Sequence, residues 1–146
     1  MDEKDNKILK ILKEDSSLTT RQIAKKTLIP ITTVHKRIKK LTDKGIIKRF
    51  TIDIDNEKIG NKFLAYVTLN VDITKLRELN LHQKELVDKI KKMEEVESAD
   101  IVVGRDDIVL KVRVKDVKEY DKFLFDKLHK IKGITSTNTL TVTYEG

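Results

Sequence analysis

Residues 19–49, TTRQIAKKTLIPITTVHKRIKKLTDKGIIKR, predict two short helices joined by a tight turn. Thr19 and Gln22 have the spacing of a capping box, in which each side chain bonds the backbone amide of the other residue. After the turn at 28–30, four apolar residues recur at helical spacing and predict one buried face: Ile31, Val34, Ile38 and Leu41. Gly45 is placed to end this second helix. The stretch therefore predicts a helix-turn-helix.

The opposite face of the second helix carries short hydroxyls and long cations, namely Thr32, Thr33, Lys36, Lys39 and Lys40. Lysines can reach phosphates and guanine edges in a DNA groove, and threonine offers a hydroxyl or a methyl group. Any amphipathic surface helix also carries lysines outside, so the helix alone does not decide between the two interpretations. The helix-turn-helix spacing, and the apolar-basic strand predicted over 46–50 after Gly45, favour a helix that reads duplex DNA.

The candidate DNA contacts fall into two groups. Thr32, Thr33, His35 and Lys36 are the candidates for reading base edges. The candidates for holding phosphates are Arg37, Lys39, Lys40, Lys48 and Arg49, with Thr19 and the start of its helix adding amide contacts. Arg37 has an alternative role, because an arginine on the flank of such a helix can pair with an acidic residue of its own domain.

The positive charge of the chain is confined to its N-terminal third. Residues 1–50 hold 14 Lys and Arg against six Asp and Glu, a net charge of +8, whereas residues 51–146 hold 17 against 18, a net charge of −1. This asymmetry indicates a polyanion-binding domain attached to a nearly neutral one. The chain has no cysteine, which excludes disulfides and thiolate metal sites, and it has no long apolar run. We therefore expect a cytoplasmic protein that makes no contact with a membrane.

Three segments are predicted along the chain. Residues 1–50, with a first helix over 2–14, form the helix-turn-helix domain. Residues 51–61 form a linker that begins in a connecting strand and ends in a hinge around Gly60. Residues 62–146 form a second domain, in which strands are predicted at 63–71, 96–103, 108–114 and 134–144, with helices at 81–93 and from 116 to about 131.

The order β-α-β-β-α-β predicts an α+β fold, with a ferredoxin-like sandwich following the helical domain. Its two helices cover one face of the sheet. The other face is expected to present Leu64, Tyr66, Val102 and Val109, which solvent alone does not favour, so we expect self-association through it.

Two other classes of function are open. A small-molecule-binding protein or enzyme with a basic appendage is one, but His35, His82 and His129 are isolated, and no Gly-rich phosphate loop or nucleophile motif occurs. No metal or cofactor is expected. An RNA-binding ferredoxin-like module is the other, although only Tyr66 is placed to stack a base.

The whole chain resembles the Lrp/AsnC ("feast/famine") transcription regulators of the archaeal type. The resemblance rests on Ile23-Ala24, residues 33–41 (TVHKRIKKL), Gly45-Ile46-Ile47, Gly104-x-x-Asp107, and Gly133-Ile134 followed by Thr137 and Thr139. It implies a homodimer that assembles into octamers in many members, binds DNA, meets the transcription machinery and senses amino acids. By the same resemblance, the effector site involves Gly104, Asp107, Thr137 and Thr139, although Gly104 and Asp107 also suit a simple hairpin turn.

The turn of the helix-turn-helix departs from the family pattern at two positions. The chain has Leu28 where the family has Gly, and Pro30 where it has a capping Ser. A left-handed conformation strains leucine, so we expect the turn to persist with altered backbone angles. Pro30 has no hydroxyl for capping but suits a helix start.

Overall fold

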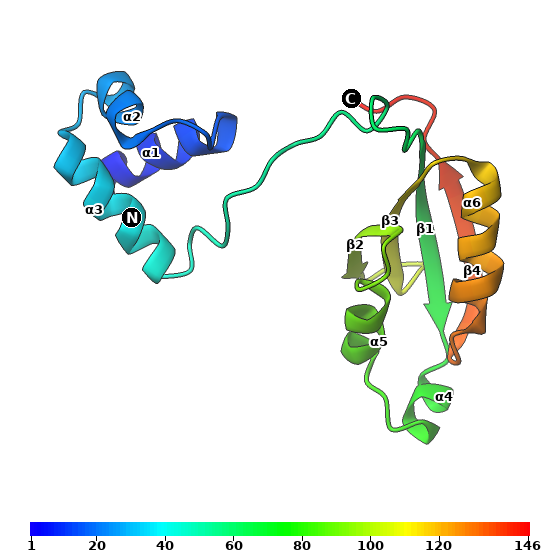
Figure 1. Ribbon diagram of the computed structural model, residues 1–146. Coiled ribbons are helices and arrows are strands. Elements are labelled where there is room, and N and C mark those ends of the chain that lie inside the picture. Colours follow the sequence, from blue (N-terminus) through cyan, green and yellow to red (C-terminus); the bar gives the residue numbers. More distant parts are fainter. The chain divides into compact units, whose positions relative to one another are not determined.

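The computed structural model describes all 146 residues, which divide into two compact units, Met1–Ile54 and Asp55–Gly146 (Figure 1). We call these the N-terminal unit and the C-terminal unit. Each has its own hydrophobic core. No helix in either unit combines the length and the apolar character needed to cross a membrane.

The N-terminal unit is a three-helix domain made of α1 (Glu3–Glu14), α2 (Thr20–Thr27) and α3 (Ile31–Asp43). Two capping boxes begin its helices. The Asp2 carboxylate accepts from the amide of Asp5 at 3.0 Å, and the Thr19 hydroxyl accepts from the amide of Gln22 at 3.3 Å. The core consists of Ile8, Ile23, Ala24, Ile29 and Val34, with Ile11, Leu12, Leu18 and Ile38 packed against it. The predicted helix-turn-helix is confirmed.

One residue of the predicted buried face of α3 is exposed. Ile31 is 47 % exposed, and Ile29 in the turn occupies the core instead, at 6 % exposed. Ile31 is the first residue of α3 and lies at the edge of its apolar face, whereas Ile29 precedes the helix and packs with residues of α1 and α2. Helical spacing alone could not distinguish these positions, because it does not place the residues of a turn.

The expectation of altered angles at Leu28 is also wrong. Leu28 keeps the left-handed conformation, with φ 56° and ψ 29°, as the C-cap of α2, and its side chain is 91 % exposed. The chain must reverse between two short helices there, and the left-handed cap supplies that reversal. Leu28 therefore carries the backbone strain of a left-handed residue, and its exposed side chain gains no packing that would offset it.

Replacing Leu28 with glycine is expected to stabilise the N-terminal unit by about 0.5–1 kcal/mol. A left-handed leucine costs roughly 1–2 kcal/mol, and the greater entropy that glycine loses on folding offsets part of the relief. Urea unfolding followed by circular dichroism measures the change. The matched control is Lys26→Gly, an exposed position inside α2, which is expected to destabilise by about 1 kcal/mol. A loss of stability in Leu28→Gly would contradict the strain argument.

The strand expected after Gly45 and across 50–55 is absent, because no strand occurs before Phe63. The segment has alternating apolar residues, but it finds no strand beside it in the chain, and a strand needs a neighbour to bond. Phe50, Ile52 and Ile54 are accordingly exposed. A hydrogen bond ties the segment to the loop after α1, since the Ser16 hydroxyl donates to the carbonyl of Thr51 at 3.1 Å.

The C-terminal unit is a four-stranded antiparallel sheet in the order β2-β3-β1-β4. Its elements are β1 (Phe63–Val71), α4 (Ile73–Glu78), α5 (Gln83–Ile90), β2 (Val96–Ile101), β3 (Ile108–Val114), α6 (Val117–Lys122), η1 (Phe123–Lys127), η2 (Leu128–Lys130) and β4 (Ile134–Thr141). This is the predicted ferredoxin-like α+β arrangement. The two helices α5 and α6 lie on one face of the sheet (Figure 1).

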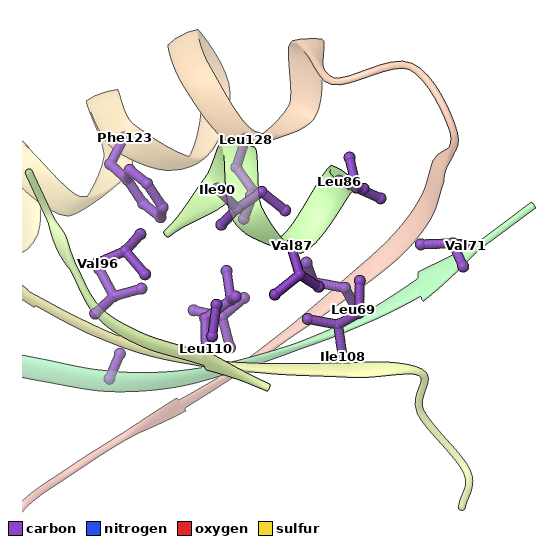
Figure 2. Close-up of a cluster of buried hydrophobic side chains, with 14 of the residues drawn as sticks. Leu69, Val71, Leu86, Val87, Ile90, Val96, Ile108, Leu110, Phe123 and Leu128 are labelled. Carbon is purple, nitrogen blue, oxygen red and sulfur yellow. The ribbon is translucent and has the colours of Figure 1, made fainter. Parts of the chain in front are cut away.

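The core of the C-terminal unit lies between the sheet and these helices (Figure 2). The last helix differs from the uniform one predicted, because η1 is a π-helical turn in which the amide of Leu128 bonds the carbonyl of Phe123. In an α-helix, residues five apart point roughly 140° from each other. The wider turn brings Phe123 and Leu128 onto the same side, and both are fully buried against the sheet.

The face of the sheet away from the helices is partly polar. Tyr66 is 40 % exposed, and Val102 and Val109 are half-buried, as expected for an uncovered face. Leu64 is buried at 4 %, contrary to the prediction. Its cross-strand partner is Arg113, which binds Glu145 at 2.8 Å from the C-terminal tail, so the tail lies beside this end of the face.

Candidate DNA-binding surface

The outward face of α3 carries cations that have no acidic partner. Lys36, Lys39 and Lys40 are exposed, as are Thr32 and His35, while Thr33 is half-buried. The ion pairs of residues 1–54 are limited to Lys7 with Glu3 and Arg37 with two aspartates. The three lysine amino groups of α3 are therefore available to an external anion.

Arg37 pairs with acidic residues of its own domain, which is the alternative role predicted for it. Its Nη1 binds the carboxylates of Asp2 at 2.6 Å and Asp5 at 2.7 Å, and so ties α3 to the start of α1. The hydrogen bond from Arg37 lowers the pKa of Asp2 to about 2. The pKa of Asp5 is lowered as well, first by the amide of Asp2 and then by Arg37. Arg37 therefore holds α1 and α3 together, which corrects its prediction as a phosphate contact.

The Arg37 pair predicts a pH-dependent stability. Because the pKa of Asp2 is lower in the folded chain than its ordinary value of 3.8, its contribution is complete above about pH 4 and is lost as the pH falls toward 2. The difference in thermal midpoint between the native chain and Arg37→Met should be largest at neutral pH and shrink across that window. In Arg37→Met, the pKa of Asp2 measured by NMR titration should rise from about 2 toward 3.8. An unchanged pKa would contradict the role assigned to Arg37.

Thr19 makes its hydrogen bonds inside the chain rather than with a ligand. Its amide donates to Gln22 Oε1 at 2.8 Å, and its hydroxyl donates to the same oxygen at 2.9 Å. The predicted amide contact from Thr19 itself is therefore corrected. The amides of Thr20 and Arg21, which begin α2, have no partner within the helix and are the donors that remain.

Lys48 and Arg49 follow a well-formed helix end. Gly45, with φ 69°, donates to the carbonyl of Thr42 at 2.8 Å, and Ile46 donates to that of Leu41 at 2.9 Å. This pair of bonds is a Schellman motif, and it confirms the helix end predicted at Gly45. It directs the chain away from α3, and both cations beyond it are exposed.

A groove of about 830 Å³ lies beside this segment, between α1 and residues 46–53. Its apolar lining includes Leu9, Leu12, Ile46, Phe50 and Ile52. Sequence reasoning missed the groove because it treated 50–55 as a strand. The alternation of apolar and polar residues in that segment was the sequence signal for an apolar surface there.

The four candidate effector residues do not form one site within the chain. Asp107 accepts the amide of Val71 at 2.9 Å, so its carboxylate fastens the β2–β3 loop to the end of β1. Thr137 bonds His129 at 3.0 Å, and Thr139 bonds Tyr120 at 2.5 Å. The two threonines lie on β4, which β1 separates from β3, so they are about 10 Å from the loop strand.

Gly104 lies exposed in the β2–β3 loop. A Cβ added to it would meet no atom within 4 Å, and its φ is not positive. The loop itself therefore does not require glycine at this position. The space over Gly104 stays open for a group from outside the chain.

Comparison with known proteins agrees with both units. Residues 1–48 match the model of a winged helix-turn-helix DNA-binding domain, and residues 70–145 match the Lrp/AsnC ligand binding domain. The chain belongs to the Lrp/AsnC family. The resemblance predicted from the sequence is confirmed, and this Lrp/AsnC protein is a DNA-binding transcriptional regulator.

Relatives of this Lrp/AsnC protein cover nearly its full length. HTH-type transcriptional regulator FL11 of Pyrococcus horikoshii is 35 % identical over 97 % of this chain and 89 % of its own. An AsnC family transcriptional regulator from Agrobacterium tumefaciens has a TM-score of 0.87 at 29 % identity, covering 99 % of this chain and 92 % of its own. A regulator from Neisseria meningitidis in complex with L-Met has a TM-score of 0.89 at 22 % identity, covering 99 % and 91 %, and shares the fold.

Proposed function

We propose that this regulator recognises specific duplex sequences through the outward face of α3. Thr32, Thr33, His35 and Lys36 face base edges, and the other free cations hold phosphates: Lys39, Lys40, Lys48 and Arg49. The observation that carries the proposal is that the three lysines of α3 have no acidic partner in the chain. It acts by binding rather than by catalysis, and it works in the cytoplasm where the DNA is.

We further propose that it binds DNA as a homodimer. Residues 49–55, RFTIDID, are complementary to a second copy of themselves in antiparallel register. With a twofold axis at Ile52, Arg49 of one copy lies opposite Asp55 of the other, and Phe50 lies opposite Ile54. The exposed Phe50 and Ile52 support this pairing, because a second strand would cover them. The exposed cross-strand pair Tyr66 and Leu140 supports a second contact through the open sheet face.

We propose that an amino acid modulates the protein in an assembly larger than one chain. The support is the ligand-binding domain match and the L-Met complex of the Neisseria regulator. Within one chain, Gly104 is open while Asp107, Thr137 and Thr139 are already bonded. A site at this loop therefore needs groups from another copy, as an octamer or a pair of dimers would bring them. Contact with the transcription machinery is part of the same proposal.

Selection of bound sites from random duplexes, with and without a panel of amino acids, tests the function. An imperfect palindrome with half-sites one or more turns of about 10 base pairs apart is expected. Lys36→Ala should weaken binding to the selected site by about 5- to 100-fold and leave binding to unrelated duplexes less affected. Lys118→Ala, an exposed lysine of the C-terminal unit, is the control. Equal binding to single-stranded RNA at the same salt would favour an RNA-binding module instead.

A further inference from the structure

The N-terminal end of α3 is apolar, although the outward face of this helix is charged. Leu28 is 91 % exposed, Pro30 is exposed, and Ile31 is 47 % exposed, all within four residues. Leu28 also holds a left-handed conformation that favours glycine. The strain costs stability, and no packing inside the chain offsets it or buries this apolar surface. The end therefore has the character of a contact surface.

The helix geometry places this end beside the predicted base readers. Ile31 and His35 are one turn apart and neighbours on the helix surface, and Lys39 continues their row. Thr32, Lys36 and Lys40 form the adjacent row. Both rows begin with a side chain that carries methyl groups and end with a cation. Since recognition helices present their N-terminal residues to base edges, the methyl-bearing end faces the bases and the cationic end faces phosphates.

We infer that Ile31, extended by Leu28, reads the C5-methyl groups of thymine in the major groove. Thymine is the base that presents an apolar group there, and aliphatic side chains recognise it by contact. Burial of Ile31 and Leu28 against thymine methyls removes apolar surface from water on both sides. The inference rests on the proposed function, since it names what the same helix discriminates.

The test replaces each thymine of the selected duplex in turn with uracil, which lacks only the methyl group. At a contacted position, the native chain should bind the uracil duplex about 3- to 10-fold more weakly. Ile31→Ser should bind the thymine duplex more weakly by a similar factor and lose no further affinity on the uracil duplex. Such non-additivity marks a direct contact. Ile73→Ser is the matched control, because Ile73 also begins a helix and is 46 % exposed.

Leu28→Gly provides a second variant that cannot fail by unfolding, because it relieves backbone strain. It should lose the methyl discrimination at a neighbouring thymine. If both variants retain the full thymine-to-uracil difference of the native chain at every position, the inference is overturned. That outcome differs from a failure of the proposed function, in which the native chain would prefer no duplex sequence at all.

Discussion

Raising the salt concentration from 50 to 200 mM is expected to weaken binding to the selected duplex by about 10³- to 10⁴-fold. Cations that contact DNA displace the counterions condensed on it, so affinity falls with salt. If about six to eight phosphates are neutralised by a dimer, the log–log slope is roughly −5 to −7. Fluorescence anisotropy of a labelled duplex across salt concentrations measures the slope. A slope near zero would remove the mechanism.

The lysines of α3 can be tested within the same titration. The double variant Lys39→Gln, Lys40→Gln should reduce the magnitude of the slope by about 2 per subunit, if each lysine holds one phosphate. The charge-matched control replaces Lys115 and Lys118, which are exposed on the C-terminal unit. An equal change in both variants would show that net charge, rather than the α3 surface, determines affinity.

Gly133→Ala is expected to destabilise the C-terminal unit by about 2–5 kcal/mol. Gly133 has φ +102°, which strains any other residue, and a Cβ there would lie 2.6 Å from Leu76 Cδ2. Leu76 is itself 2 % exposed and has little room to move. Backbone strain of roughly 1–2 kcal/mol adds to an overpacking cost of about 1–3 kcal/mol. Urea unfolding of the full chain measures the loss.

Gly60→Ala separates the two costs. Gly60 has φ +90°, but a Cβ there meets nothing within 4 Å. It should therefore show the backbone cost alone, about 1–2 kcal/mol. Equal losses in the two variants would mean that Leu76 adapts without cost, and would contradict the overpacking at Gly133.

The sequence predicted the elements that depend on local chemistry. The capping box at Thr19, the helix end at Gly45 and the alternation along 63–71 each follow from residues within one turn or one strand. It failed where a choice depends on other parts of the molecule. Residues 50–55 have a strand pattern and no partner strand in the chain, so the pattern alone could not decide their conformation.

The candidate DNA surface was likewise predicted only in part. The free lysines of α3 follow from helical spacing and the charge asymmetry of the chain. The fate of Arg37 depends on Asp2 and Asp5, more than 30 positions away, and no local pattern shows that they meet. The effector residues came from the family resemblance, and the bonds of Thr137 and Thr139 inside the chain depend on the packing of η2 and α6 against β4.

The division into two cores bears on how melting curves are interpreted. Ile8 and Ile23 belong to one cooperative block, and Phe123 and Leu128 to another. Differential scanning calorimetry should then resolve two heat-absorption peaks, with Leu28→Gly moving only the first block's peak and Gly133→Ala only the second's. A single transition temperature quoted for the whole chain would mix two independent equilibria.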